Sequence, residues 1–508
     1  MPRQRRLTER PERPRFIYFI AVIYQEAENS GISRQHQPFK YYSFKMNLVE
    51  IKQAAIDYAL AEFTSVAREK DIPGIAFGLI LKGELIFASG VGETKIGNTI
   101  TPTADSIFRI ASMSKSFTAD AILLLRNRGL LRLEDPMSKH LPWCSTMGAP
   151  EVIAALTIRD LLTMGGGFPT DDPWGDRQED IPLQNLDSLV AAGITFNRFP
   201  NTGFEYSNLG YALLGRIISV VSGEDFEVFM KREIQDQYGL TSSTYFTDEV
   251  SEEVRVAGYA KFDSGLTLEP TTRNGGFTPM GGLHSSVSEL AKWVAQFQSG
   301  KPEAQLPARH AQSKLAKAQE DIPERIISTH YGYGLFIDDD AELGRFISHS
   351  GGYPGFGSHM RWHPQSGWGI VALANLTYAP MSITSTKIMN YIANLYKEKS
   401  PADLDMNDAT KSAMGAVEML LESWDESIAD SLFCMNMDLD EPRAQRRAEV
   451  ESLSAKFGPF VMIDGSVESS TRSHAKWKVQ GSTSQLHIEI LMSPEKNPTI
   501  QKLTILEV

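Results

Sequence analysis

Cysteine is scarce in this 508-residue chain, and only Cys144 and Cys434 are present, which excludes a disulfide framework. No run of 18 consecutive apolar residues occurs, so the sequence predicts no membrane-spanning helix. Positive charge is in deficit, because 50 Lys and Arg stand against 63 Asp and Glu, and the net charge of −13 argues against nucleic-acid binding. Internal repeats and low-complexity segments are also absent. The remaining composition, with 42% apolar residues, is typical of a globular enzyme with a large core.

The first 45 residues differ from the rest in charge, since they carry a net +5 while residues 46–508 carry −18. Within them, residues 16–24 are apolar but too few to cross a bilayer, and no small-x-small cleavage site follows. Met46 opens an apolar pattern with helical spacing. We therefore expect a disordered extension over 1–45 and a cytoplasmic protein, and the sequence leaves open whether translation starts at Met1 or at Met46. Export or membrane anchoring through residues 16–24 is the alternative.

A Ser-x-x-Lys string at Ser112 to Lys115 is the first of three short strings that suggest chemistry. Apolar residues recur with helical spacing after it until Gly129, so we expect Ser112 at the start of a helix. Residues i and i+3 share a helix face, which brings the Lys115 amine within reach of the Ser112 hydroxyl. A serine hydroxyl is a poor nucleophile until a neighbouring base takes its proton. A helix N-terminus disfavours an ammonium group, so it favours the neutral form of Lys115, which can act as this base. The Ser-x-x-Lys string occurs twice more, at Ser473 and at Ser493, and we expect no catalytic role for these two copies.

Tyr206 and Asn208 form the second string, on a loop that enters an apolar helical run ending at Gly223. A phenol near a lysine ammonium loses its proton more readily, so we expect Tyr206 to act as general base and then as general acid. The Asn208 amide is suited to hold Lys115 or a substrate carbonyl. Taken alone, this string is more typical of an ordinary turn, and its interpretation depends on its neighbours.

The third string, His349-Ser-Gly-Gly, predicts a strand that runs into a glycine-rich turn. Glycine lets a substrate approach the backbone closely, so we expect Ser350 and Gly351 to bind substrate. Strand N–H groups can contribute to an oxyanion hole together with the Ser112 N–H. His349 is expected to bind a substrate carboxylate or to share in proton transfer. A lone histidine near a strand end is, however, more often structural.

In this order the strings resemble the β-lactamase-related serine hydrolases, which include class C β-lactamases, DD-peptidases, D-aminopeptidases and family VIII esterases. The matching strings are Phe108-Arg-Ile-Ala-Ser-Met-Ser-Lys, Tyr206-Ser-Asn-Leu-Gly-Tyr, Gly281-Gly-Leu-His-Ser-Ser and His349-Ser-Gly-Gly. The resemblance covers residues 46–397 and implies an acyl-enzyme mechanism without a metal or organic cofactor. It implies the following roles: nucleophile Ser112, proton-transfer pair Lys115 and Tyr206, orienting residue Asn208, and oxyanion-hole N–H groups of Ser112 and Gly352.

Two departures from the family pattern bear on the substrate. The third string begins with His349, where β-lactamases and most penicillin-binding proteins carry Lys-Thr-Gly, and this argues against efficient antibiotic hydrolysis. It resembles the peptidase and D-amino-acid-selective branch. Met164 replaces a histidine of a loop that often reads Leu-Leu-Thr-His-Thr-Ser-Gly-Leu-Pro in relatives, so the polar contacts of that loop are in question.

The fold class that we predict is α+β. Residues 74–93 indicate a hairpin around Lys82-Gly83, and residues 344–376 indicate three more strands. The expected β-lactamase/transpeptidase-like domain, over 46–397, has an antiparallel sheet flanked by helices and a helical insertion, with the active site at their junction. No Gly-x-Ser-x-Gly elbow surrounds Ser112, which excludes a parallel-sheet α/β-hydrolase. A linker over 398–414 and a small α+β domain over 415–508, of unknown role, are expected to follow.

Together these patterns predict a serine hydrolase that acts on a small ester or on a D-amino-acid amide or peptide. Two alternatives stay open: a catalytically silent scaffold that keeps the fold, and a weak β-lactamase. The expected partner is a small-molecule or short-peptide substrate. We expect no cofactor, no metal, no nucleic acid and no stable membrane insertion, and the sequence leaves homo-oligomer formation open.

Overall fold

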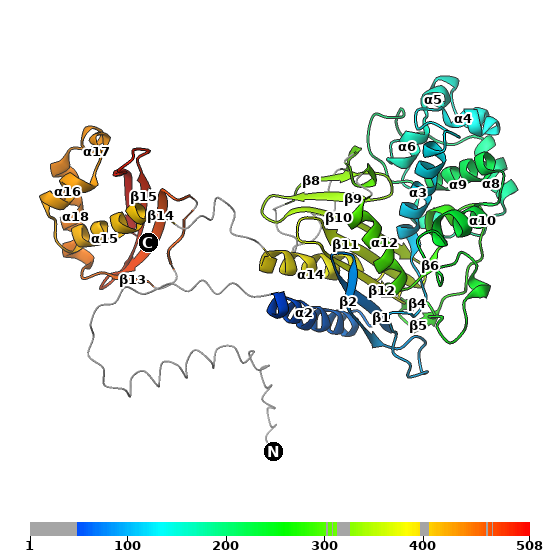
Figure 1. Ribbon diagram of the computed structural model, residues 1–508, viewed down its shortest axis with the longest axis horizontal. Helices are drawn as coiled ribbons and strands as arrows, with labels where there is room; N and C mark the ends of the chain where they lie inside the picture. Colours follow the sequence, from blue (N-terminus) through cyan, green and yellow to red (C-terminus); the bar gives the residue numbers. More distant parts are fainter. Residues whose placement is uncertain are drawn as a thin grey trace, which may run out of the picture. The chain divides into compact units, whose positions relative to one another are not determined.

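The computed structural model describes residues 48–300, 303–306, 308–311, 326–396, 406–463, 466–469 and 471–507 (Figure 1). The predicted extension over 1–45 lies outside the described residues. Helix α2 (Leu48–Glu69) begins where the apolar spacing after Met46 predicts a helix, and its side chains at every fourth position, Ile51, Ala55, Ala59, Phe63 and Ala67, are buried. In the described part of the chain, none of the helices has the length and apolar character needed to cross a membrane.

An eight-stranded antiparallel sheet, in the order β2-β1-β12-β11-β10-β9-β8-β7, forms the centre of the part that precedes residue 397. Its strands are β1 (Gly74–Leu81), β2 (Glu84–Gly92), β7 (Arg309–Ala311), β8 (Ile326–Tyr331), β9 (Phe336–Asp340), β10 (Gly344–Tyr353), β11 (Phe356–His363) and β12 (Trp368–Ala374). Lys82 and Gly83 both have positive φ values, 52° and 84°, as the predicted hairpin turn requires. The register joins β1 from Ile75 to Leu81 to the whole of β12, so the sheet contains strands from both ends of the predicted domain. The predicted antiparallel α+β fold is confirmed.

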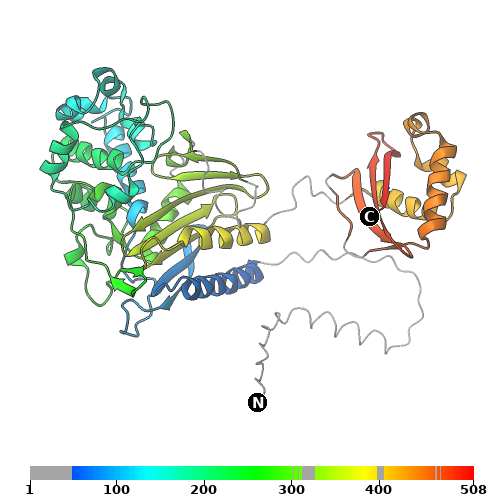
Figure 2. The same cartoon turned by 180° about the vertical axis from the view of Figure 1, so that it is seen from behind.

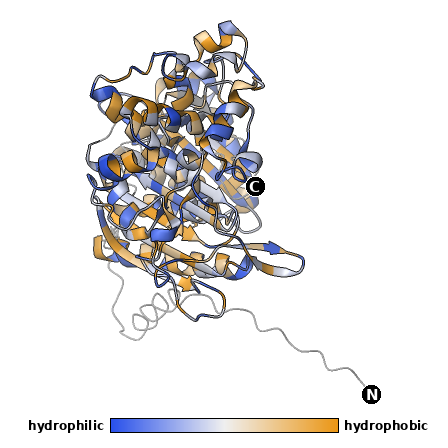
Figure 3. Cartoon of the chain, turned by 90° about the vertical axis from the view of Figure 1, so that its right-hand side faces the viewer, coloured by the Kyte–Doolittle hydropathy of each residue, from blue (hydrophilic) through white to orange (hydrophobic). Residues whose placement is uncertain are grey.

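Helices cover both faces of this sheet, which explains why every residue of β1 and β12 is buried. On one face α2 and α14 (Met381–Tyr396) pack against alternate strand residues, among them Phe77 and Ile370. On the other face α12 (Val287–Ser299) and the helical insertion pack against the intervening residues, among them Ala76 and Val371. Figure 2 shows the same layers from behind, and in Figure 3 the helices carry both hydrophobic and hydrophilic residues, as two-faced elements should.

The helical insertion lies between β2 and β7 in sequence. Its α-helices are α3 (Ser114–Asn127), α4 (Met137–His140), α5 (Pro150–Ala155), α6 (Ile158–Leu162), α7 (Asp172–Gly175), α8 (Leu183–Ala191), α9 (Asn208–Ser222), α10 (Phe226–Met230) and α11 (Thr278–Gly281). Two short antiparallel pairs complete it: β3 (Phe108–Arg109) with β6 (His284–Ser285), which are far apart in sequence, and the hairpin of β4 (Tyr259–Phe262) with β5 (Gly265–Leu268). Helices α3 and α9 pack against each other in its core. They start at Ser114 and Asn208, so this packing brings the first two strings together.

The C-terminal part has a hydrophobic cluster of its own. Four helices, α15 (Asp408–Glu422), α16 (Glu426–Leu432), α17 (Met435–Asp440) and α18 (Arg443–Phe457), precede an antiparallel sheet of β13 (Val461–Met462), β14 (His474–Gln480), β15 (Gln485–Met492) and β16 (Ile500–Glu507). The order of helices before strands agrees with the sequence prediction. Helix α15 begins at Asp408, however, inside the segment that we expected to be a linker. Asn407 accepts a hydrogen bond from the Thr410 N–H at 2.7 Å, so the polar residues there cap a helix.

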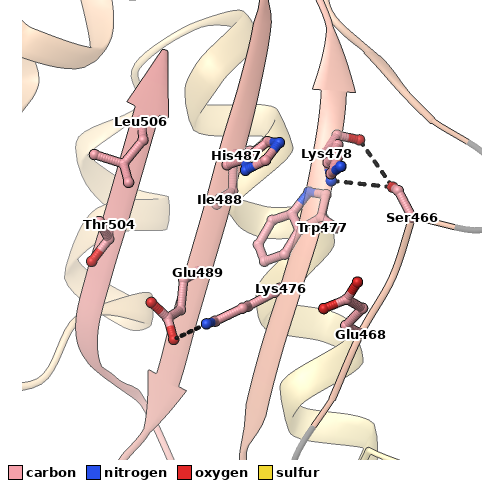
Figure 4. Close-up of a pocket in the computed structure, with 10 residues that line it drawn as sticks. All are labelled: Ser466, Glu468, Lys476, Trp477, Lys478, His487, Ile488, Glu489, Thr504 and Leu506. Carbon is pink, nitrogen blue, oxygen red and sulfur yellow. Dashed lines mark hydrogen bonds and ion pairs between the residues drawn. The ribbon is translucent and has the colours of Figure 1, made fainter. Parts of the chain in front are cut away.

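The two further Ser-x-x-Lys copies lie on this C-terminal sheet rather than on helices. The pair Ser473 and Lys476 straddles the start of β14, and Ser493 follows β15. Lys476 lines a hollow of about 270 Å³ on the sheet, where its amine pairs with Glu489 at 3.3 Å (Figure 4). Side chains of neighbouring residues on a strand point to opposite faces, so this spacing does not produce the helical serine–lysine contact.

Candidate active site

Ser112 lies in a single 3-10 turn (Ala111–Met113) between β3 and α3, directly before the helix that the sequence predicts. The preceding residue, Ala111, has a φ of 49°, a left-handed conformation that residues with a Cβ rarely adopt. The turn is held by the Ser114 hydroxyl, which donates to the Ala111 carbonyl at 2.7 Å. Strained backbone of this kind persists where the surrounding structure fixes the position of a functional side chain.

Lys115 is completely buried, and its amine has three partners: Ser112 Oγ at 2.8 Å, Asn208 Oδ1 at 2.7 Å and the Met280 carbonyl at 2.9 Å. Burial lowers the pKa of Lys115 to about 8, although carboxylates, Asp172 first among them, oppose this decrease. The amide and carbonyl oxygens can only accept hydrogen bonds. A neutral amine therefore gives its two protons to them and turns its lone pair toward the Ser112 hydroxyl. This arrangement allows Lys115 to take the serine proton.

Two aspartates that the sequence interpretation missed hold Asn208 in place. The Asn208 side-chain amide donates to Asp172 Oδ1 at 2.8 Å, which turns its oxygen toward Lys115. The neighbouring Asp171 accepts from the backbone N–H groups of Asn208 and Leu209, at 2.6 and 2.8 Å, and so caps α9. Ser207 directly before the helix is also a cap, since its hydroxyl accepts from the Gly210 N–H at 3.3 Å, whereas the two aspartates come from the start of α7, more than 30 residues away. The only signal in the sequence is the acidic pair after the glycine-rich loop.

Tyr206 lies beside Lys115, whose amine is 5.0 Å from the centre of its ring. The ring of Phe336 is nearly parallel to it, with centroids 6.4 Å apart. We expected the lysine to lower the pKa of the phenol, and this was wrong. Burial and the charge of Asp172 raise the pKa of Tyr206 well above its ordinary value, and a hydrogen bond with Ser112 only partly offsets them. Tyr206 therefore stays protonated, and it is better suited to donate a proton than to remove one.

His349 is buried in the wall of the site, and both of its ring nitrogens have partners. Nδ1 lies 2.6 Å from the Ser350 carbonyl, so it carries the proton, and Nε2, 3.2 Å away, accepts from the Tyr331 hydroxyl. Burial lowers the pKa of His349 to about 3, so the imidazole is neutral. A neutral ring offers no charge to a substrate carboxylate, which removes the main reason for the carboxylate-binding role that we expected.

The three residues after His349 divide between two faces of β10. A Cβ on Gly351 would clash with the Ile110 carbonyl, so glycine here lets the turn Ala111–Met113 lie directly against the strand; because it carries the predicted nucleophile Ser112, we call it the nucleophile turn. The Ser350 hydroxyl points to the opposite face, where it contacts His359 Nδ1 at 2.9 Å. This corrects the expectation for the Ser350 side chain, because only its backbone faces the site. Strand alternation is the physical reason.

The edge of β10 that carries Gly352 lies open to the nucleophile turn. Strand β10 pairs with β9 over Gly344–Ser348, and beyond Ser348 its registered partner among the described residues is β11. The N–H groups of Ser112 and Gly352 as an oxyanion hole stay a prediction from the resemblance.

Arg109 joins three elements around the nucleophile turn, and the sequence interpretation missed this role. Its Nε donates to the Gly281 carbonyl at 3.2 Å, its guanidinium pairs with the buried Glu179, and it lies 3.9 Å from the centre of the Tyr353 ring. Burial raises the pKa of Glu179 to about 7, against the opposing charge of Arg109. Because Arg109 stands three residues before Ser112, these contacts fix the nucleophile turn relative to the end of β10.

Met164, which replaces the loop histidine of many relatives, still contacts the second string. Its sulfur lies 3.4 Å from the Ser207 N–H, and its carbonyl accepts from the Glu205 N–H at 2.9 Å. Backbone and thioether contacts of Met164 therefore take the place of the polar side-chain contacts that were in question for this loop.

We predict that Asp172→Asn will move the pH dependence of kcat/KM. Activity should rise with pH through about 8 in the wild type, because Lys115 must lose its proton to act as a base. The carboxylate of Asp172 raises the pKa of Lys115, so its removal should shift this rise to lower pH. The asparagine keeps an oxygen for Asn208. Asp263→Asn, in an exposed turn, is the control and should leave the profile unchanged. A shift to higher pH would contradict the prediction.

Comparisons with known proteins bear on the family and the fold. The family model described as Beta-lactamase matches residues 54–389. The protein Flp of Staphylococcus aureus (strain COL) is 27% identical over 330 residues, which cover 63% of this chain and 64% of Flp. Penicillin-binding protein 4* of Bacillus subtilis (strain 168) is 28% identical over 300 residues, which cover 55% of this chain and 62% of the relative. The matches thus span just under two thirds of these curated relatives.

A solved structure with the same fold is that of the octameric penicillin-binding protein homologue from Pyrococcus abyssi. The TM-score is 0.58, with 20% sequence identity, and the superposition covers 89% of this chain and 99% of the other. At this level of identity the likeness establishes the fold alone.

Proposed function

The chain belongs to the β-lactamase family, whose members are serine hydrolases, and from this premise we propose that it hydrolyses a small ester or a D-amino-acid amide or peptide. The observation that carries the proposal is the geometry at the Lys115 amine, where Asn208 Oδ1 and the Met280 carbonyl accept its two protons in the neutral form and leave the lone pair for the Ser112 hydroxyl. A lysine that is fully buried, with its pKa lowered to about 8, is suited to a general base.

In the proposed mechanism Lys115 removes the proton of Ser112 while the serine oxygen attacks the substrate carbonyl. The N–H groups of Ser112 and Gly352 stabilise the oxyanion. Tyr206, whose pKa is raised, gives its proton to the leaving group, and the Lys115 ammonium then restores that proton. In the second half water attacks the acyl-enzyme and its proton passes to Lys115. The Lys115 ammonium then gives this proton to Ser112 Oγ as the ester bond breaks, so Ser112 leaves as the alcohol and the acid is released. Every group returns to its starting state.

Two observations support this proposal over the alternatives. The hydrogen bonds among Ser112, Lys115 and Asn208 form a continuous set, which a scaffold without catalysis has no need to keep. His349 is neutral, so this part of the wall supplies no cation for the carboxylate of a β-lactam antibiotic. We therefore favour an ester or D-amino-acid substrate over a β-lactam.

The test measures release of p-nitrophenol from p-nitrophenyl butyrate and of p-nitroaniline from D-alanine p-nitroanilide, with intact-mass analysis after a fluorophosphonate probe. We expect turnover of at least one substrate and one adduct on the wild type. Ser112→Ala should show neither. Release of the phenol alone would identify an esterase, and release of the aniline would identify an aminopeptidase. Absence of turnover together with absence of an adduct on the wild type would overturn the proposed function.

A further inference from the structure

Tyr378 occupies an unusual position between β12 and α14. It is 51% exposed although it is a large aromatic residue. Its φ is 52°, in the left-handed region that favours glycine. The backbone is nevertheless well fixed, because its N–H donates to the Phe356 carbonyl at 3.1 Å and the preceding Thr377 hydroxyl contacts the backbone at Gly355 and Tyr259. Strained backbone of this kind is typically kept where it positions a functional side chain, which points to a role for the Tyr378 ring in the active site.

The ring of Tyr378 lies directly on Gly352, the predicted oxyanion donor. A Cβ built on Gly352 would come within 2.6 Å of Tyr378 Cδ1 and 3.2 Å of Cε1. No other residue type leaves room for the ring at this distance. The Tyr378 ring therefore explains the second glycine of the third string from the Ser350 face of β10, whereas the nucleophile turn explains the first glycine from the opposite face.

The Tyr378 hydroxyl reaches across to the helical insertion. It donates to Asp176 Oδ2 at 2.8 Å, and Asp176 is only 3% exposed, at the end of α7. The negative charge of Asp176 also acts on Lys115. The next residue, Arg177, pairs with Glu269 at 3.2 Å, so a second side-chain contact ties the same loop to the end of β5. Tyr378 thus forms a bridge from the sheet to the loop that lies beside the catalytic lysine.

We propose that Tyr378 is the specificity-determining residue of the site, and that its ring, tethered to Asp176, closes the acyl side of the site and restricts the substrate to small acyl groups. This inference rests on the proposed function. Tyr206 gives its proton to the leaving group in that mechanism, so the leaving group lies on the Tyr206 side. The acyl group then extends along the open edge of β10, past Gly352, where the Tyr378 ring stands.

Tyr378, which forms the proposed wall of the acyl side, lies at the surface of the protein and not in its hydrophobic core. One side of Tyr378 faces solvent, and its hydroxyl has one hydrogen bond to the opposite loop. Removal of the ring therefore opens space to solvent without leaving a cavity in the hydrophobic core. The backbone contacts of Tyr378 do not depend on its side chain, so substitution should not disturb the nucleophile turn.

The test compares short and long acyl groups in Tyr378→Ala, Tyr378→Phe and the wild type. The probes are p-nitrophenyl butyrate and octanoate, together with ethyl and dodecyl fluorophosphonates whose attachment to Ser112 is followed by intact mass. We expect the long-to-short ratio of kcat/KM, and of labelling rates, to rise at least about tenfold in Tyr378→Ala. Tyr378→Phe keeps the ring and loses its tether, so it should give a smaller increase.

Tyr391→Ala is the matched control, because Tyr391 also lies on this side of the sheet but stacks on Tyr58, with ring centroids 4.1 Å apart. Its long-to-short ratio should equal that of the wild type. An unchanged ratio in Tyr378→Ala, with short-chain labelling intact, would overturn the assignment of Tyr378 while the proposed function stands. Absence of labelling by either probe in the wild type would overturn the proposed function itself. The labelling assay needs no turnover, so these two failures are distinguishable.

Discussion

Ser112→Ala is expected to lower kcat/KM by about 10⁴-fold or more on any substrate that the wild type turns over. The hydroxyl is the nucleophile of the proposed mechanism, and no oxygen can replace it in covalent catalysis. The fold should survive, because Ser112 is small and lies in a turn held by Ser114 and by the hydrogen bond from Met113 N–H to the Ile110 carbonyl. The measurement is kcat/KM beside the thermal midpoint, which should stay within a few degrees of the wild-type value.

The chain supplies its own matched control for this substitution. Ser473 opens another Ser-x-x-Lys string, but its lysine, Lys476, pairs with Glu489 on a strand. Ser473→Ala should therefore leave kcat/KM unchanged. If Ser112→Ala kept activity within tenfold of the wild type, the acyl-enzyme mechanism would be wrong. If Ser473→Ala lost activity as well, the helical context of the first string would not be what distinguishes it.

The sequence predicted the catalytic strings well where local geometry decides the contact. The spacing of Ser112 and Lys115 places them on one face near a helix start, and the structure has their side chains 2.8 Å apart. The hairpin at Lys82-Gly83 and the strands after residue 344 follow from turn residues and alternation, which are also local signals. The same alternation would have assigned Ser350 to the face opposite His349, had it been applied within the third string.

Long-range partners could not be predicted in the same way. Asp172 reaches Asn208 only because α7 and α9 pack together, and Arg109 reaches Glu179 only through the approach of the insertion to β3. The protonation of Tyr206 and His349 also depends on burial, which a string of letters does not record. For Tyr206 we considered the lysine charge alone, whereas loss of solvent and Asp172 act in the opposite direction and prevail.

Lys115→Met is expected to lower kcat/KM by about 10³-fold or more, because it removes the base of the proposed mechanism and keeps the volume of the side chain. The residual activity should no longer rise with pH through about 8, since that rise reflects the loss of a proton from Lys115. The thermal midpoint should fall moderately. Methionine leaves Asn208 Oδ1 and the Met280 carbonyl without their donor, at about 1–3 kcal/mol for each buried group, but it also relieves the burial of an amine.

Tyr206→Phe separates the two candidate bases. If Lys115 is the base, Tyr206→Phe should slow release of poor leaving groups, such as anilines, more than release of p-nitrophenol, and the rise of activity near pH 8 should remain. If Tyr206 were the base, that rise would disappear in Tyr206→Phe and persist in Lys115→Met. Lys476→Met, in the C-terminal Ser-x-x-Lys string, controls for the loss of a lysine and should change neither activity nor its pH dependence. The contacts of the Lys115 amine favour the first outcome, because the lone pair of a neutral lysine has the Ser112 hydroxyl as its one remaining partner.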